Sequence, residues 1–244
     1  MNITVITKQY KKLALREREI LRYAGCREEE EAIVRLMRTC LQEAEQTNAL
    51  SGQLCYAELP VMPDVAVNCR EGFLAKRNGF CDFGGFSVHS EQLAKNLQGC
   101  SKVLLLAATA GVGIDRLIGK YGRIAPSKAL MFQAIGAELV EAVCDTFSKE
   151  YETEYHCRLR PRFSPGYGDL PLETQKDIFA VLDCAKRIGL TLNDSLLMSP
   201  SKSVTAFVGT EDGSIKNGMA EKEKNRKQKT CGNCERKDCM YRGE

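Results

Sequence analysis

A nine-residue apolar run from Lys102 to Ala110 constrains the fold of this chain most strongly. It reads Lys-Val-Leu-Leu-Leu-Ala-Ala-Thr-Ala and ends at Gly111 and Gly113, which predicts a buried strand, a tight turn and a helix beginning at Asp115. The glycines do not complete a dinucleotide-binding loop, because Arg116 stands where that motif has its third glycine and no Walker lysine follows. We therefore expect a packing turn.

The remaining periodicity predicts helices and short strands that do not alternate as regular βαβ units. After a strand at the N-terminus, helices are expected over Leu13–Tyr23, Glu28–Glu45, from a Ser87 or Ser90 cap to Leu97, from a Ser127 cap to Tyr155, and over Leu172–Ile188. Further strands or extended segments are expected over Leu54–Leu59, Val65–Asn68, Leu190–Met198 and Ser203–Gly209. This order predicts an α+β fold rather than a doubly wound sheet.

Length and charge limit the classes of function that this chain can have. The 244 residues suffice for one large domain with an appendage. Between Lys216 and Glu244, nine Lys and Arg stand against five Asp and Glu, so the net charge of +3 leaves the rest near −1. The core therefore does not favour nucleic acid as a partner. The sequence shows no bilayer-length apolar run and no signal-peptide pattern, so we expect a cytoplasmic protein without membrane contact.

The spacing of the cysteines distinguishes the main part of the chain from its C-terminal tail. Of twelve cysteines, nine are scattered from Cys26 to Cys184 and are expected to be reduced, mostly buried, small hydrophobic residues. We expect a main domain over residues 1–212, a charged linker over 213–230 and a flexible tail over 231–244. The tail holds Cys231, Cys234 and Cys239, whose spacing predicts a metal centre, either an iron–sulfur cluster or zinc with a fourth ligand from elsewhere. Redox-active or free thiols are the alternative.

A six-residue turn, Arg162-Phe-Ser-Pro-Gly166-Tyr167, combines groups that suit a small, flat ligand bearing a carboxylate. Arg162 offers a planar fork for a carboxylate, and Tyr167 offers an aromatic face and a hydroxyl. Gly166 permits close approach of the backbone. Upstream, Glu141 lies among small residues on one face of the expected long helix. By themselves these residues also fit a surface turn and a solvated glutamate.

Several signals in fixed order strengthen the binding interpretation. They are Arg162-Phe-Ser-Pro-Gly-Tyr, Pro171, Lys176, Ile188-Gly-Leu-Thr-Leu-Asn-Asp-Ser, Met198-Ser-Pro and Ser203-Val-Thr. Together, over about fifty residues, they resemble the activation domain of cobalamin-dependent methionine synthase. The preceding helix, with Leu139-Val-Glu141-Ala, resembles that family as well.

The resemblance implies a single curved domain with an antiparallel sheet flanked by helices. It also implies binding of S-adenosylmethionine for the reductive methylation of cob(II)alamin. Arg162 would bind the ligand's carboxylate, Gly166 and Tyr167 would line the adenosyl part, and Glu141 would face the sulfonium and ammonium groups. In this family the attacking atom is cobalt, so no nucleophile of the protein is implied.

The chain departs from the family pattern in ways that bear on its partners. No Asp-x-His-x-x-Gly cobalamin-ligating motif is present, and the family's aromatic pair after the last strand is absent. We therefore expect the cobalamin on a separate methionine synthase or other corrinoid protein, with flavodoxin or ferredoxin as electron donor.

Two other functions remain open at this point. One is a non-catalytic iron–sulfur electron-transfer or docking module for a corrinoid methyltransferase, which keeps the fold without the ligand. The other is a zinc-knuckle nucleic-acid binder, which the sparse aromatic residues near the tail do not favour, since only Tyr241 lies close by.

Overall fold

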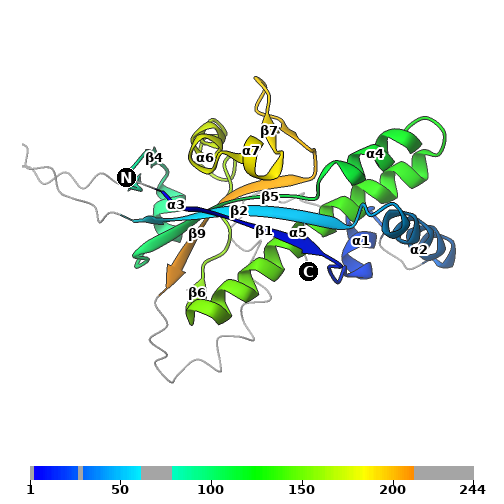
Figure 1. Ribbon diagram of the computed structural model, residues 1–244, viewed down its shortest axis with the longest axis horizontal. Coiled ribbons are helices and arrows are strands. Elements are labelled where there is room, and N and C mark those ends of the chain that lie inside the picture. The colour runs from blue at the N-terminus through cyan, green and yellow to red at the C-terminus, as the bar shows by residue number, and fades with distance from the viewer. Residues whose placement is uncertain (1–2, 27–29, 62–78, 212–244) are drawn as a thin grey trace, which may run out of the picture. The chain divides into compact units, whose positions relative to one another are not determined.

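The computed structural model describes residues 3–26, 30–61 and 79–211 (Figure 1). Its main sheet is five-stranded and antiparallel throughout, in the order β1-β2-β5-β9-β6. The strands are β1 (Val5–Lys11), β2 (Ser51–Pro60), β5 (Lys102–Thr109), β9 (Ser203–Glu211) and β6 (Arg158–Leu159). Helices flank this curved sheet, so the expected α+β class with an antiparallel sheet is confirmed.

The helices are α1 (Glu17–Tyr23), α2 (Glu31–Gln46), α3 (Glu91–Asn96), α4 (Val112–Tyr121), α5 (Pro126–Tyr155), α6 (Thr174–Leu182) and α7 (Cys184–Ile188). Two small hairpins complete the described part, β3 (Phe80–Asp82) with β4 (Ser87–His89) and β7 (Thr191–Leu192) with β8 (Met198–Ser199). In Figure 1, α5 runs along one side of the sheet, and α6 and α7 lie on the other.

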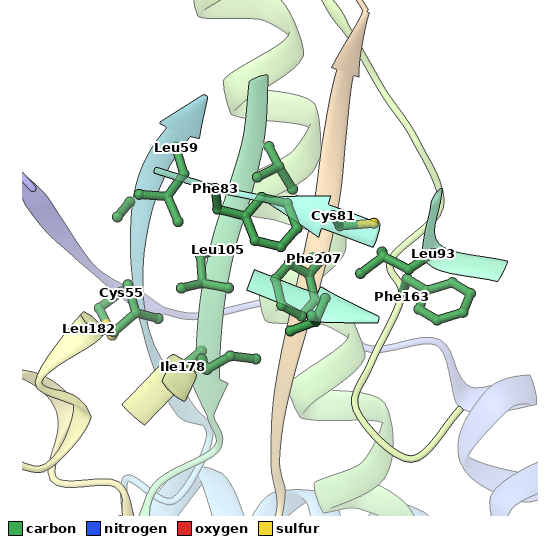
Figure 2. Close-up of a cluster of buried hydrophobic side chains, with 14 of the residues drawn as sticks. Cys55, Leu59, Cys81, Phe83, Leu93, Leu105, Phe163, Ile178, Leu182 and Phe207 are labelled. Atoms are coloured by element: carbon green, nitrogen blue, oxygen red, sulfur yellow. The ribbon is translucent and has the colours of Figure 1, made fainter. Parts of the chain in front are cut away.

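Strand β5 is buried on both faces, which explains its continuous apolar sequence. Successive side chains of a strand point to opposite faces. Leu105 therefore packs with Phe207, Ile178 and Leu182 beneath α6 and the β3–β4 hairpin, as Figure 2 shows. On the opposite face, Leu104, Leu106 and Ala108 of β5 pack against α5. The central strand thus requires a cover on each side.

The 30-residue helix α5 serves two cores. Its C-terminal half covers the sheet through residues such as Val143 and Phe147. Its N-terminal half extends beyond the sheet, where Phe132 and Ile135 pack with α1, α2 and α4, for example against Ile114. One long helix therefore connects the sheet to a helical cluster at its end.

Two of the predicted helix starts were wrong, and a third had two candidates between which the structure decides. Helix α1 begins at Glu17 rather than Leu13, because the preceding leucines pack in an extended segment. Helix α5 has Ala125 at its N-cap and a proline at the first helical position, where no backbone donor is needed, so Ser127 is not the cap. Of the two candidates for α3, Ser90 is the cap, since its hydroxyl accepts a hydrogen bond from Leu93 N.

Other predicted bounds also shift. The helix expected over Leu172–Ile188 is broken at Asp183, whose φ of 49° separates α6 from α7. Helix α4 starts at Val112, three residues before the expected Asp115. The segment from Leu190 to Met198 forms the β7–β8 hairpin instead of one extended stretch. The strand expected over Val65–Asn68 lies outside the described residues, and so do the predicted linker over 213–230 and the predicted tail over 231–244.

Within the described ranges, no helix is both long and apolar enough to cross a membrane. Six of the cysteines described there are buried, and no disulfide joins any of the eight. This agrees with the expectation that most of them serve as small buried hydrophobic residues.

Candidate functional site

The segment that carries Arg162 extends the edge of the sheet beside β9. Arg160 N donates to Gly209 O at 2.8 Å, and Phe163 and Phe207 exchange backbone hydrogen bonds of 2.9 Å in both directions. Beyond Phe163 the chain leaves the strand and turns. The backbone is therefore bonded to β9 both before Arg162, at Arg160, and after it, at Phe163.

The turn itself is closed by its own backbone. Gly166 N donates to Leu170 O at 2.9 Å, and Tyr167 N donates to Ser164 O at 3.0 Å. Gly166 has a φ of 84°, in the left-handed region that side chains disfavour, so the glycine has a conformational reason. The Tyr167 ring meets Phe163 edge-on, with 5.3 Å between centroids, yet half of Tyr167 is exposed. The turn thus presents an aromatic ring at the surface.

From residue 203 to 206, no described strand pairs with the edge of β9 next to this turn, and in this sense the edge is open. In an antiparallel strand, alternate residues direct their backbone N–H and C=O groups to the same edge. Because Phe207 bonds to Phe163, Thr205 and Ser203 direct theirs to the same side. Thr205 is only 1% exposed, and its hydroxyl has no hydrogen-bond partner among the described residues. Buried polar groups normally have partners, so this edge suits a ligand that supplies them.

Arg162 is held by two carboxylates from α5. Its Nη2 lies 2.5 Å from Glu141 Oε2, and its Nη1 lies 3.0 Å from Asp145 Oδ1. The Arg162 side chain is one-quarter exposed. Burial alone lowers the pKa of Arg162, but Cys144, Glu141 and Asp145 together raise it, so the group stays charged.

A second arginine extends this ion-pair network. Arg16, just before α1, contacts Glu138 Oε1 through its Nε at 2.8 Å and its backbone N at 3.2 Å. The Glu138 side chain is fully buried. Arg16 Nη2 also lies 3.5 Å from Asp145 Oδ2, so Asp145 bridges the two arginines. Three carboxylates and two guanidinium groups give the network a formal charge of −1.

The structure places the four predicted ligand-binding residues as follows. Glu141 and Arg162 are in direct contact, and Gly166 and Tyr167 form the turn that follows Arg162. Whereas Arg162 was expected to offer its fork to a ligand, Glu141 and Asp145 occupy that fork here. The roles of these residues toward a ligand stay predictions.

Sequence reasoning missed three members of the network. Glu138 and Asp145 stand three residues before and four residues after Glu141, the spacing of one helix face, and this spacing was a usable signal. Arg16 had no such signal, because it stands 122 residues from Glu138 along the chain.

The predicted metal ligands Cys231, Cys234 and Cys239 lie outside the described residues. In the part that is described, no three His, Cys, Asp or Glu side chains gather as a metal site would require.

Comparisons with known proteins agree with the fold. The model of a family described as "Vitamin B12 dependent methionine synthase, activation domain" matches residues 89–228, more than half of the chain. Among solved structures, the chain resembles a crystal structure of the MetH reactivation domain bound to AdoHcy, with a TM-score of 0.56 and 14% identity. That likeness covers 87% of this chain and 80% of the other, and shows a shared fold. No curated protein matches the sequence.

The network makes a prediction about stability. Arg16→Ala leaves the buried Glu138 carboxylate without its cation, so the free energy of unfolding should fall by about 2 kcal/mol. Arg35→Ala is the matched control, because its pair with Glu31 is exposed and 3.8 Å long, and it should change stability by less than about 0.5 kcal/mol. Urea denaturation of the three proteins measures both values. Equal effects of the two substitutions would contradict the network.

Proposed function

The chain belongs to the family of vitamin B12-dependent methionine synthase activation domains, and on that basis we propose that it binds S-adenosylmethionine beside Arg162. The bound ligand supplies a methyl group for the reductive methylation of cob(II)alamin. The observation that carries the proposal is the open edge of β9 at Thr205, next to a charged pair between Arg162 and Glu141. The likeness in fold to a reactivation domain bound to AdoHcy supports it.

Binding at this site is an exchange of partners. S-adenosylmethionine carries a carboxylate, an ammonium and a sulfonium, so its net charge of +1 complements the network's formal −1. Arg162 turns its fork to the ligand's carboxylate, and Glu141 faces the cationic groups. Because Arg162 and Glu141 each receive a new partner of opposite sign and Asp145 keeps Arg16, the exchange avoids leaving a partly buried charge unpaired.

The adenosyl part lies along the turn. Tyr167 offers an exposed ring for the flat base, and Gly166 allows the backbone to come close. Thr205 contributes its hydroxyl, which has no partner among the described residues, and its backbone groups at the edge of β9 that no described strand pairs with. The residues of this chain bind and orient, and they exclude water from the methyl group that is transferred.

The cobalamin belongs, in this proposal, to a separate methionine synthase or other corrinoid protein, because the 244 residues contain no Asp-x-His-x-x-Gly motif. Flavodoxin or ferredoxin supplies the electron. We further propose that Cys231, Cys234 and Cys239 bind an iron–sulfur cluster or zinc, as their spacing predicts. A low-potential cluster would connect the electron donor to the methylation.

The first prediction from the proposed function concerns Arg162. Arg162→Ala removes the fork for the carboxylate, so S-adenosylmethionine should bind about 100-fold more weakly by isothermal titration. Arg162→Lys keeps the charge without the fork and should give an intermediate affinity. Arg116→Ala, an exposed arginine on α4, is the control and should bind as the wild type does. The proposal would be wrong if the wild-type protein showed no saturable binding, or if Arg162→Ala bound S-adenosylmethionine with wild-type affinity.

The second prediction separates the sulfonium from the rest of the ligand. AdoHcy keeps the carboxylate and the ammonium but lacks the positive sulfur. Glu141→Gln should therefore weaken S-adenosylmethionine by more than it weakens AdoHcy, by a ratio of about five. Titration of both ligands into both proteins gives this ratio directly. A ratio of one would mean that Glu141 does not face the sulfonium.

The third prediction tests the activity. A cobalamin-loaded methionine synthase without its own activation domain is mixed anaerobically with reduced flavodoxin and S-adenosylmethionine. Adding this chain should convert the cob(II)alamin absorption spectrum to that of methylcobalamin, and adding Arg162→Ala should not. Conversion at the same rate without the chain would contradict a reactivating role for it.

A further inference from the structure

Helix α3 lies on the face of the sheet opposite α5, and it contacts the chain on both sides of the Arg162–Tyr167 turn. Before Arg162, the Asn96 side-chain amide donates to Pro161 O at 3.3 Å. After Tyr167, Asp169 bonds to the first turn of α3. A short helix thus spans the segment that carries the predicted ligand residues.

Asp169 is the stronger of these two attachments. Its carboxylate accepts hydrogen bonds from the Ser90 hydroxyl, from Glu91 N at 2.7 Å and from Gln92 N at 3.3 Å. Burial would raise the pKa of Asp169, but the bonds from Ser90, Glu91 and Gln92 lower it. The carboxylate is therefore ionised at neutral pH, and its bonds to α3 are charge-assisted.

The turn also lies against α3 by close packing. Gly168 has a φ of 59°, and a Cβ placed there would stand 2.2 Å from Gln92 Oε1. A larger residue at this position would adopt a disfavoured backbone conformation and would displace the exposed end of the Gln92 side chain. Leu93 anchors α3 in the core beside Phe163, as Figure 2 shows, and it is fully buried. The helix that Asp169 bonds to is thus itself anchored in the core.

We propose that Asp169 is a positioning residue: by clamping the turn to α3, it holds Gly166 and Tyr167 where the ligand meets them. This inference rests on the proposed binding of S-adenosylmethionine. Phe163 fixes one end of the turn to β9, and Asp169 fixes the other end to α3. Only the few residues between these points are left to move, so less conformational entropy is lost on binding.

The experiment uses the full chain and two readouts. The chain has no tryptophan, so Tyr167→Trp places a single fluorophore on the turn. Asp169→Asn is added because an amide has one acceptor oxygen and its NH2 group opposes the N–H donors of α3. Asp177→Asn, an exposed acid in the first turn of α6, is the matched control. Affinity for S-adenosylmethionine is measured in the proteins that keep Tyr167.

In the Tyr167→Trp background, Asp169→Asn should increase the amplitude of the fast, nanosecond component of the time-resolved anisotropy. In the Tyr167 background it should weaken S-adenosylmethionine by about tenfold, the equivalent of one charge-assisted hydrogen bond. Asp177→Asn should change neither. Far-UV circular dichroism at the assay temperature confirms that each variant is folded, so a general loss of structure does not mimic the result.

Unchanged anisotropy in the Asp169→Asn variant would overturn the clamp, whether or not the wild type binds the ligand. Wild-type affinity in that variant would overturn it as well. If the wild type itself fails to bind S-adenosylmethionine, the proposed function falls, while the anisotropy still decides whether Asp169 positions the turn. The two failures are therefore distinguishable.

Discussion

Burial of β5 on both faces is the constraint on which the arrangement of this protein depends. A strand that is apolar on each side requires one layer of cover on either face of the sheet. Helix α5 covers one face, and α3, α6 and the β3–β4 hairpin cover the other. The neighbouring strand, β9, pairs with the segment that runs from β6 to Phe163, and its pairing on that side ends there. The candidate site therefore lies where both covering layers reach an incompletely paired edge.

Each layer contributes a different property to this site. Helix α5 contributes charge, because Glu141 and Asp145 project from it toward Arg162. Helix α3 contributes position, because its first turn binds Asp169. The edge of β9 contributes backbone groups and the unpartnered hydroxyl of Thr205. A cationic ligand with a carboxylate suits this combination, since it replaces the partners of both the arginine and the acids.

The network also explains why an arginine with two carboxylates fits a binding role. An ion pair near the surface contributes little to stability, because solvent screens it and ordering its side chains costs entropy. Arg162 is one-quarter exposed, and Glu141 is one-third exposed, so their pair belongs nearer to this class than to a buried one. The contact between Arg16 and the fully buried Glu138 has the more structural character. Exchangeable pairs near the surface and a fixed pair behind them suit a site at which a ligand can replace internal partners.

The sequence predicted those parts of the fold that depend on local pattern. The run at Lys102–Thr109 indicated a buried strand, and the order of motifs around Arg162 indicated the family. Helix ends were less predictable, because proline at the start of α5 and the left-handed Asp183 overrode the simple cap and periodicity signals.

Contacts over long sequence distances were not predictable from one sequence. Arg16 reaches Glu138, and Asp169 reaches the start of α3, only because the sheet brings the two chain segments together. No local pattern marks either residue. The site residues that sequence reasoning found, Arg162 and Tyr167, are adjacent to a recognisable turn, whereas the residues that support them are not.

A crystal structure of the full chain with AdoHcy would show whether the ligand lies beside Arg162. We predict ligand density between the Arg162–Tyr167 turn and the open edge of β9, with hydrogen bonds to the backbone or hydroxyl of Thr205. The Arg162 guanidinium should contact the ligand's carboxylate instead of both Glu141 and Asp145. Density elsewhere on the protein, or an empty edge with Arg162 still bound to both acids at saturating ligand, would contradict the account.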